Sequence, residues 1–292
     1  MSTQQVDVGG FPVHVEDHAA SGAGAGGGST VVLVHGWPLS GESWAHQVPV
    51  LTEAGHRVVT VDRRGFGRSG HPDDERYDYD ALTDDLEQVL DALDVQDAVL
   101  VGFSMGGGEV IRYAARHPQG RARAVVLAAA VPPFLEKNDD NPDGPLPPAG
   151  ADEMKNGLEA DRDGFLAGFV HTFFSAGDQL AVDEQEVAAA VALAQQSHQP
   201  AALACIDSFA HTDFRADVAA VAQAGLPVLV LHGDADAIVP LEGSGQRSHD
   251  AIPGSTLEVI AGGPHGINAS HPDEFNRALL AFVAGTAGGA GA

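Results

Sequence analysis

Two patterns of hydrophobic and polar residues alternate along the chain. Short runs of Val, Leu and Ala between turn-forming residues predict strands at 31–36, 57–62, 98–103, 124–130, 227–233 and 256–262. Because these runs are almost continuously apolar, both faces of each strand should be covered, as in a parallel sheet. Segments with apolar residues three or four positions apart predict helices at 43–54, 80–94, 105–117, 243–252 and 272–284. This alternation indicates an α/β fold with a doubly wound, mostly parallel sheet.

The N-terminal part departs from this rhythm. Apolar and polar residues alternate over 3–8 and 11–17 on either side of Gly9-Gly10, which predicts a β-hairpin. The stretch "SGAGAGGGS" at 21–29 lacks the Lys-Ser/Thr ending and the following helix of a phosphate-binding loop. We therefore interpret it as a flexible turn.

A long interval separates two of the predicted strands and defines the expected domains. Residues 131–225 begin with a Pro- and Asp-rich loop and continue with helical patterns. We expect this segment to form a helical cap over the carboxyl ends of the strands, where α/β sheets bind ligands. The core would then comprise residues 1–130 and 226–284, followed by a disordered tail at 285–292.

Charge excludes several classes of partner. The 292 residues carry a net charge of −26, from 41 acidic and 15 basic side chains. Such a surface repels phosphate backbones and anionic lipids, so we expect neither nucleic acid nor a membrane as partner. Two interpretations of the acidity stay open: adaptation to high salt, or an ordinary acidic enzyme from an Ala- and Gly-rich proteome.

Targeting and redox signals are few. The single cysteine, Cys205, excludes an internal disulfide and a zinc site built on several cysteines. The N-terminus shows no basic segment followed by an apolar run, and no apolar stretch reaches the length of a membrane span. We therefore predict a cytoplasmic protein.

The stretch "GFSMG" places Ser104 between a predicted strand and a predicted helix. A nucleophile on such a sharp turn needs strained backbone angles and small neighbours, which the glycines at 102 and 106 provide. The positive end of the following helix dipole would point to the same place. Ser104 is thus the candidate nucleophile, and a structural serine that caps the helix is the alternative.

A serine hydroxyl becomes nucleophilic only when a base accepts its proton. Of the 14 histidines, His265 is the best placed, in a glycine-rich loop between the last strand and the last helix. An acid must orient its imidazole, and the loop after the strand at 227–233 offers Asp234 and Asp236. We favour Asp236, which lies further into the loop, and expect Asp234 to bind turn backbone.

Acyl transfer also needs two donors for the developing oxyanion. The backbone N–H of Met105, directly after the candidate nucleophile, is one. Trp37, in the loop after the first central strand, is the candidate for the second, since Pro38 has no N–H.

Several motifs together resemble a known family. They are "HGWPLSGESW", "DRRGFGRS", "GFSMGGGEVIRY", "HGDADAIVP", "GGPHGINASH" and the cap stretch "CIDSFAHTDFRADV". The chain is similar to the bacterial cofactor-free haloperoxidases, also called perhydrolases or non-haem chloroperoxidases, and to the related aryl esterases of the α/β-hydrolase fold. The resemblance covers about residues 30–284.

The resemblance implies a Ser104–Asp236–His265 triad and an oxyanion hole from Trp37 and Met105, without metal, haem or flavin. It implies hydrolysis of small carboxylic and aryl esters through an acyl-serine. Hydrogen peroxide can replace water and give a peracid that oxidises halide, and members often form homo-oligomers.

Further residues should face Ser104 and shape a pocket for a small acyl or aryl group. Trp37, Phe134, Phe169 and Ile238 lie in the segments expected there. Ordinary cap and core packing would explain the same apolar side chains.

Several alternative functions lead to different expectations. A lactonase or an amidase would use the same triad on another acyl substrate, and a substrate panel would separate them. A haloalkane dehalogenase or epoxide hydrolase is disfavoured because it needs a carboxylate at position 104. A non-catalytic ligand receptor on this fold is the alternative of another class, and slow turnover with a retained ligand would mark it.

Overall fold

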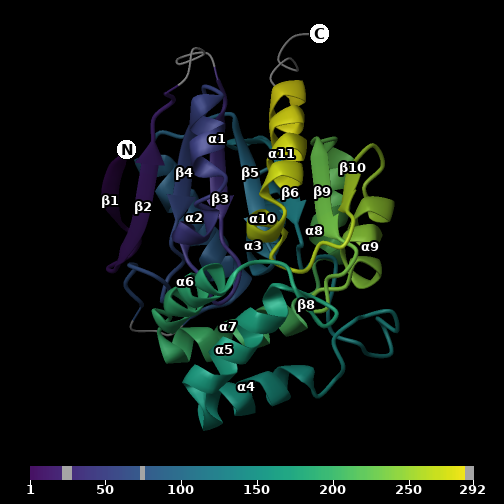
Figure 1. The fold of residues 1–292 in the computed structure, drawn as a ribbon. Helices are drawn as coiled ribbons and strands as arrows, with labels where there is room; N and C mark the ends of the chain where they lie inside the picture. The colour runs from purple at the N-terminus through teal and green to yellow at the C-terminus, as the bar shows by residue number, and fades with distance from the viewer. Residues whose placement is uncertain (22–27, 73–75, 287–292) are drawn as a thin grey trace.

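The chain folds into a central sheet with helices on both faces and a separate helical layer below it (Figure 1). The computed structural model describes residues 1–21, 28–72 and 76–286. Most of the predicted turn at 21–29 and residues 287–292 of the predicted tail lie outside the described residues. The first two residues of that tail belong instead to the last helix, which ends at Thr286.

The described part of the sheet has eight strands in the order β1-β2-β4-β3-β5-β6-β9-β10. The hairpin strands and β4 pair antiparallel, and the remaining pairs are parallel. The strands are β1 (Ser2–Asp7), β2 (Pro12–His18), β3 (Thr30–Val34), β4 (Arg57–Val61), β5 (Ala98–Phe103), β6 (Ala122–Ala128), β9 (Val228–Gly233) and β10 (Thr256–Ile260). The predicted hairpin and the predicted parallel sheet are both confirmed.

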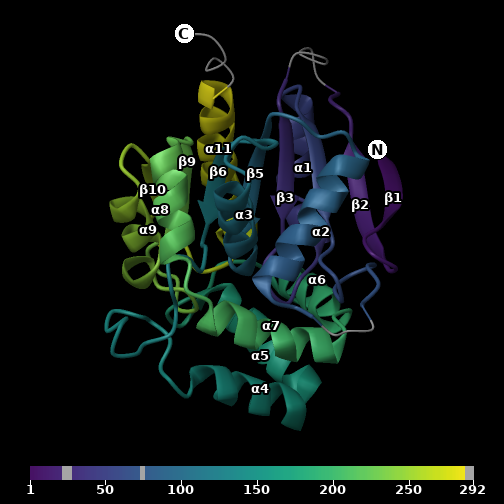
Figure 2. The same ribbon diagram turned by 180° about the vertical axis from the view of Figure 1, so that it is seen from behind.

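Helices cover both faces of this sheet, which explains why its central strands show no polar alternation. One face carries α1 and α11, and the other carries α2, α3 and α8 (Figures 1 and 2). All six residues of β5 are buried between these layers. The helices of the core are α1 (Val48–Glu53), α2 (Tyr79–Ala92), α3 (Met105–Arg116), α8 (Arg215–Ala224), α9 (Gly245–Ala251), α10 (Ile267–Ser270) and α11 (Pro272–Thr286), with short 3-10 turns η1 (Gly41–Trp44) and η2 (Leu241–Gly243).

Four helices and a short hairpin form the layer below the sheet. They are α4 (Gly150–Ala160), α5 (Arg162–Phe173), α6 (Glu184–Gln195) and α7 (Gln199–His211), with β7 (Ser175–Ala176) and β8 (Gln179–Leu180). Within the described residues, no helix is both long enough and apolar enough to cross a membrane.

The expected cap at 131–225 extends too far at its C-terminal end. Helix α8 packs against α3 beside the sheet, where Arg112 pairs with Asp217 (3.0 Å) and its guanidinium lies over the ring of Phe214. The buried Val218 and Val221 of α8 face the core. The physical reason is connectivity: β6 and β9 are parallel neighbours, so the chain must cross back along the sheet between them.

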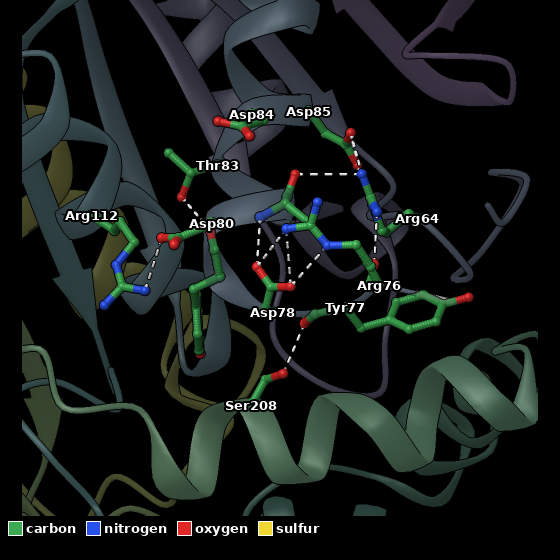
Figure 3. Close-up of polar contacts among 12 residues, drawn as sticks. Arg64, Arg76, Tyr77, Asp78, Asp80, Thr83, Asp84, Asp85, Arg112 and Ser208 are labelled. Carbon is green, nitrogen blue, oxygen red and sulfur yellow. Dashed lines mark hydrogen bonds and ion pairs between the residues drawn. The ribbon is translucent and has the colours of Figure 1, made fainter. Parts of the chain in front are cut away.

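The cap is fastened to the core at the segment that precedes α2 (Figure 3). Ser208 of α7 donates a hydrogen bond to the Tyr77 carbonyl (2.8 Å), and Arg64 donates to the Arg76 carbonyl next to it (2.7 Å). The carboxylate of Asp78 then caps the first turn of α2. One short stretch of backbone therefore connects cap, sheet layer and helix start.

The burial of the central strand predicts a large difference between two truncations. Leu100→Ala, at a fully buried position of β5, should lower the free energy of unfolding by about 2–5 kcal/mol. Val259→Ala, on edge strand β10 with 44% of the side chain exposed, should change it by less than about 0.5 kcal/mol. Urea unfolding with unchanged m-values measures both, and equal midpoints would contradict the layered core.

Candidate active site

Ser104 occupies a strained turn between β5 and α3. Its φ of 53° is a left-handed value that a residue with a side chain rarely adopts. The turn is tight because a methyl group at Gly102 would lie 2.3 Å from the Gly106 carbonyl oxygen, and one at Gly106 would lie 2.5 Å from the Val34 carbonyl oxygen. The side chain of Ser104 makes no capping bond to α3. The hydroxyl is therefore not used as a helix cap.

The predicted serine, histidine and acid meet in one hydrogen-bonded chain. His265 Nε2 lies 2.9 Å from Ser104 Oγ, and His265 Nδ1 lies 2.7 Å from Asp236 Oδ2. All three residues are buried, and the His265 side chain is fully enclosed. Since an ionised carboxylate only accepts, Nδ1 carries the proton and Nε2 is left to accept the serine proton. This is the arrangement that general-base activation of a serine requires.

The surroundings of Asp236 keep it ionised. Its Oδ1 accepts the backbone N–H groups of Ile238 (2.9 Å) and Val239 (2.8 Å). Burial by itself would raise the pKa of Asp236, but the charge of His265 and hydrogen bonds from His232 and His265 outweigh it, so the pKa lies well below the usual range of a carboxyl group. A negative charge is thus available to stabilise an imidazolium.

The alternative acid, Asp234, has another place in the structure. Its Oδ1 accepts the Gly262 N–H (2.6 Å), and it lies on the exposed side of the turn after β9. Asp234 therefore binds turn backbone and does not join the chain that contains His265.

Two backbone donors are available near the serine. Among the hydrogen bonds found for the described residues, the N–H groups of Met105 and Trp37 have no acceptor. Met105 begins α3, where backbone N–H groups are unpaired and the helix dipole is positive. The Trp37 side chain is held in place by a hydrogen bond from its indole Nε1 to the Ala202 carbonyl (3.1 Å).

A buried charge pair supports the loop that carries Trp37. Arg63 donates from Nε to Glu109 of α3 (2.6 Å) and from Nη2 to the His35 carbonyl (2.5 Å). The backbone N–H of Arg63 donates to His35 Nε2 (2.9 Å), while His35 Nδ1 faces the Gly36 carbonyl (2.8 Å). Burial and the neighbouring Arg63 lower the pKa of His35 to about 3, so this ring is neutral.

A cavity of about 450 Å³ opens over Ser104. The predicted pocket residues Trp37, Phe169 and Ile238 line it, and the ring of Phe169 meets that of Trp37 edge-on at 4.9 Å. The rest of its lining is Val131, Leu135, Pro145, Leu146, Met154, Gly164, Phe165, Gly168, Thr172, Phe209 and Val239. None of these side chains is charged, so the cavity suits a neutral, apolar group.

Phe134 is not brought to this cavity, and its prediction as a pocket residue is wrong. Its ring lies against the guanidinium of Arg215, 5.5 Å away, and its carbonyl accepts from Asn141 (3.1 Å). The next residue, Leu135, lines the cavity instead. A displacement of one residue in an irregular loop reverses which side chain points inward, and no periodic pattern predicts that choice.

Two further contacts, one to His265 and one to Asp236, are not predicted by the sequence. Phe173, at the end of α5, packs edge-on against the His265 ring at 5.0 Å, and its carbonyl accepts the Gly266 N–H (2.8 Å). His232 lies 3.3 Å from Asp236 Oδ2. The spacing of four residues between His232 and Asp236 was visible, but nothing in it indicates that the side chains converge.

The described residues contain no group of three or more His, Cys, Asp or Glu side chains arranged to hold a metal ion. The buried Cys205 thiol has its pKa raised to about 12 by burial, so it is a poor nucleophile. Ser104, the candidate nucleophile, lines the cavity.

Comparison with known proteins agrees with this geometry. The family described as alpha/beta hydrolase fold matches residues 29–272. A non-haem chloroperoxidase from Kitasatospora aureofaciens is 40% identical over 263 residues, 88% of this chain and 93% of that protein. A bifunctional esterase/perhydrolase from Acinetobacter calcoaceticus is 38% identical over 253 residues, 85% of this chain and 89% of that protein. The crystal structure of a bromoperoxidase from Bacillus anthracis superimposes with a TM-score of 0.90 at 45% identity, covering 97% of this chain and 99% of that one. The resemblance inferred from the motifs is confirmed.

The neutral His35 predicts a loss of stability in mild acid. An unfolded histidine takes up a proton near pH 6.5, whereas the folded ring resists protonation down to about pH 3. Stability should therefore fall as pH falls through this window, by up to about 1.4 kcal/mol per pH unit for one proton.

Urea unfolding from pH 7 to pH 4.5 of the wild type and His35→Asn measures this contribution. The variant cannot take up the proton, so its stability should depend less steeply on pH. Parallel curves for the two proteins would show that the buried ring contributes nothing to acid sensitivity.

Proposed function

Because the chain belongs to the α/β-hydrolase fold family, we propose that it is a serine hydrolase that cleaves small, apolar carboxylic and aryl esters, with hydrogen peroxide as an alternative acyl acceptor. The observation that carries this proposal is the hydrogen-bonded Ser104–His265–Asp236 chain at the floor of an uncharged cavity. The similarity to a bifunctional esterase/perhydrolase and to non-haem chloroperoxidases supports the same chemistry. A cytoplasmic location is a further prediction from the sequence, homo-oligomers are implied by the resemblance, and adaptation to high salt is one of the two interpretations of the acidity.

Acylation begins with proton transfer from Ser104 Oγ to His265 Nε2 while Oγ attacks the ester carbonyl carbon. The charge that develops on the carbonyl oxygen is bound by the N–H groups of Met105 and Trp37. Asp236 accepts a hydrogen bond from His265 Nδ1 and so keeps the imidazolium ring in its orientation. The C–O bond to the alcohol breaks, and His265 returns the proton to the leaving oxygen.

Deacylation repeats these steps with a second nucleophile. Water gives up a proton to His265, attacks the acyl-serine and releases the carboxylic acid. Hydrogen peroxide attacks in the same way and releases a peracid, which oxidises halide after it leaves the enzyme. Both routes restore the Ser104 hydroxyl and need no metal or organic cofactor.

The cavity sets the substrate class. Among the described residues that line it, Thr172 is the one side chain besides Ser104 and the indole of Trp37 that carries a polar atom, and none is charged, so a charged acyl group would lose its hydration without a partner. The net charge of −26 further disfavours anionic substrates. Neutral esters with an alkyl or aryl group on either side fit these constraints.

The first experiment is hydrolysis of p-nitrophenyl acetate by wild type and Ser104→Ala, at low and at molar salt. We expect kcat to fall by at least about 10³-fold in the variant, because the acyl-serine cannot form. A variant that stays folded and keeps its turnover would overturn the proposal, and a higher rate at molar salt would support adaptation to high salt.

Two neighbouring carboxylates provide a matched pair for the acid. Asp236→Asn should lower kcat by about 10²- to 10⁴-fold, since the amide cannot stabilise an imidazolium. Asp234→Asn, which still accepts the Gly262 N–H through its amide oxygen, should keep kcat within about threefold. Equal effects of the two substitutions would contradict the assignment.

The peroxide route is tested at Pro38, whose ring limits the backbone of the loop next to the oxyanion donors. We expect Pro38→Leu to lower the ratio of peracetic acid to acetate formed from one ester in the presence of peroxide. Bromination of an added halogen acceptor reports the peracid. An unchanged ratio would remove Pro38 from the choice between water and peroxide.

A further inference from the structure

A second buried histidine contacts the carboxylate oxygen that His265 uses. His232 is the penultimate residue of strand β9 and precedes the loop that carries Asp236, here called the acid loop. Its Nε2 atom lies 3.3 Å from Asp236 Oδ2, and both side chains are completely buried. The same Nε2 lies 2.8 Å from the Val239 carbonyl oxygen. One ring nitrogen therefore contacts both ends of the four-residue segment 236–239.

Its partners assign the tautomer of His232. The Val239 carbonyl can only accept, so Nε2 must carry the proton and donate to it. The other nitrogen, Nδ1, is buried and has no hydrogen-bond partner within the part of the chain that the structure describes. A methyl group at Gly245 would approach this nitrogen to 2.5 Å, so α9 encloses it tightly.

The backbone and the imidazoles contact different oxygens of the carboxylate. Both loop N–H groups, from Ile238 and Val239, bind Oδ1 of Asp236. The contacts of Oδ2 come from the two imidazoles, at 2.7 Å from His265 and 3.3 Å from His232.

We propose that His232 is a positioning residue for the reaction: its Nε2–H, which donates to the Val239 carbonyl, also faces Asp236 Oδ2 at 3.3 Å, and so keeps this oxygen toward His265 and ties the acid loop to strand β9. The inference rests on the proposed serine hydrolase activity. It adds a link to the substrate cavity, because Ile238 and Val239 of the same loop line that cavity. The Ile238 and Val239 N–H groups already join this wall to the acid, and His232 adds a second connection through the Val239 carbonyl and Asp236 Oδ2.

The test compares two substitutions of similar size. The amide of His232→Gln can place an N–H near the Nε2 position, whereas His232→Met fills the space without a donor. We expect His232→Met to lower kcat for p-nitrophenyl acetate by about 10- to 100-fold with KM changed by less than about threefold, and His232→Gln to restore most of the loss. A fall in kcat that is equal in both variants, or less than about twofold in His232→Met, would overturn the proposal.

A readout without turnover separates this proposal from the assignment of function. The His265 Nδ1–H proton, in its short bond to Asp236, should give a strongly downfield proton NMR signal in wild type. The signal should persist in His232→Gln and move upfield or vanish in His232→Met. If no ester is hydrolysed by the wild type, the proposed function fails, and the NMR comparison still decides the role of His232.

Should His232→Met not fold, His232→Asn replaces it. The shorter amide cannot reach the Val239 carbonyl and Asp236 Oδ2, so it should behave as the methionine variant is expected to. Identical kinetics and NMR signals for His232→Asn and His232→Gln would overturn the proposal.

Discussion

The close approach of strand β5, helix α3 and strand β3 around Ser104 is the constraint on which the rest of the site depends. Gly102 and Gly106 let these backbones come so near that no methyl group fits between them. The turn then forces Ser104 to a φ of 53°, an unfavourable value that surrounding packing must maintain. The Ser104 hydroxyl makes no capping bond to α3, and the backbone N–H of Met105, the first residue of that helix, follows it directly in the chain. The same turn therefore places both the candidate nucleophile and one candidate oxyanion donor.

Buried polar groups hold the other parts of the site in relation to this turn. Arg63 links Glu109, on the helix that follows the serine, to the loop that carries Trp37. Asp236 receives two backbone N–H groups and two imidazoles in a region without water access. Such groups are costly to bury unless every partner is present, so each network restricts its loops to one arrangement. This restriction is what a site needs when misplacement of about 1 Å lowers the rate strongly.

The cap contributes more than a lid. The end of α5 packs Phe173 on the face of the His265 ring, and α7 binds the indole of Trp37 through the Ala202 carbonyl. The same layer supplies Met154, Phe165, Phe169 and Phe209 to the apolar wall above Ser104. The cap therefore helps to fix the positions of the His265 ring and of the loop that carries Trp37.

The sequence by itself determined the layered architecture and the candidate triad. Near-continuous apolar runs and 3–4 periodicity follow from burial, and the order serine, acid, histidine lies at strand ends, where loops of a parallel sheet converge. Glycines at 102 and 106 could be interpreted before folding because they report a local requirement. Only the tertiary structure decided that Leu135 and not Phe134 faces the cavity, that α8 joins the sheet layer, and that His232 meets Asp236. These features depend on contacts between residues distant in space or on irregular loops without a period, and no local pattern encodes the direction in which such side chains point.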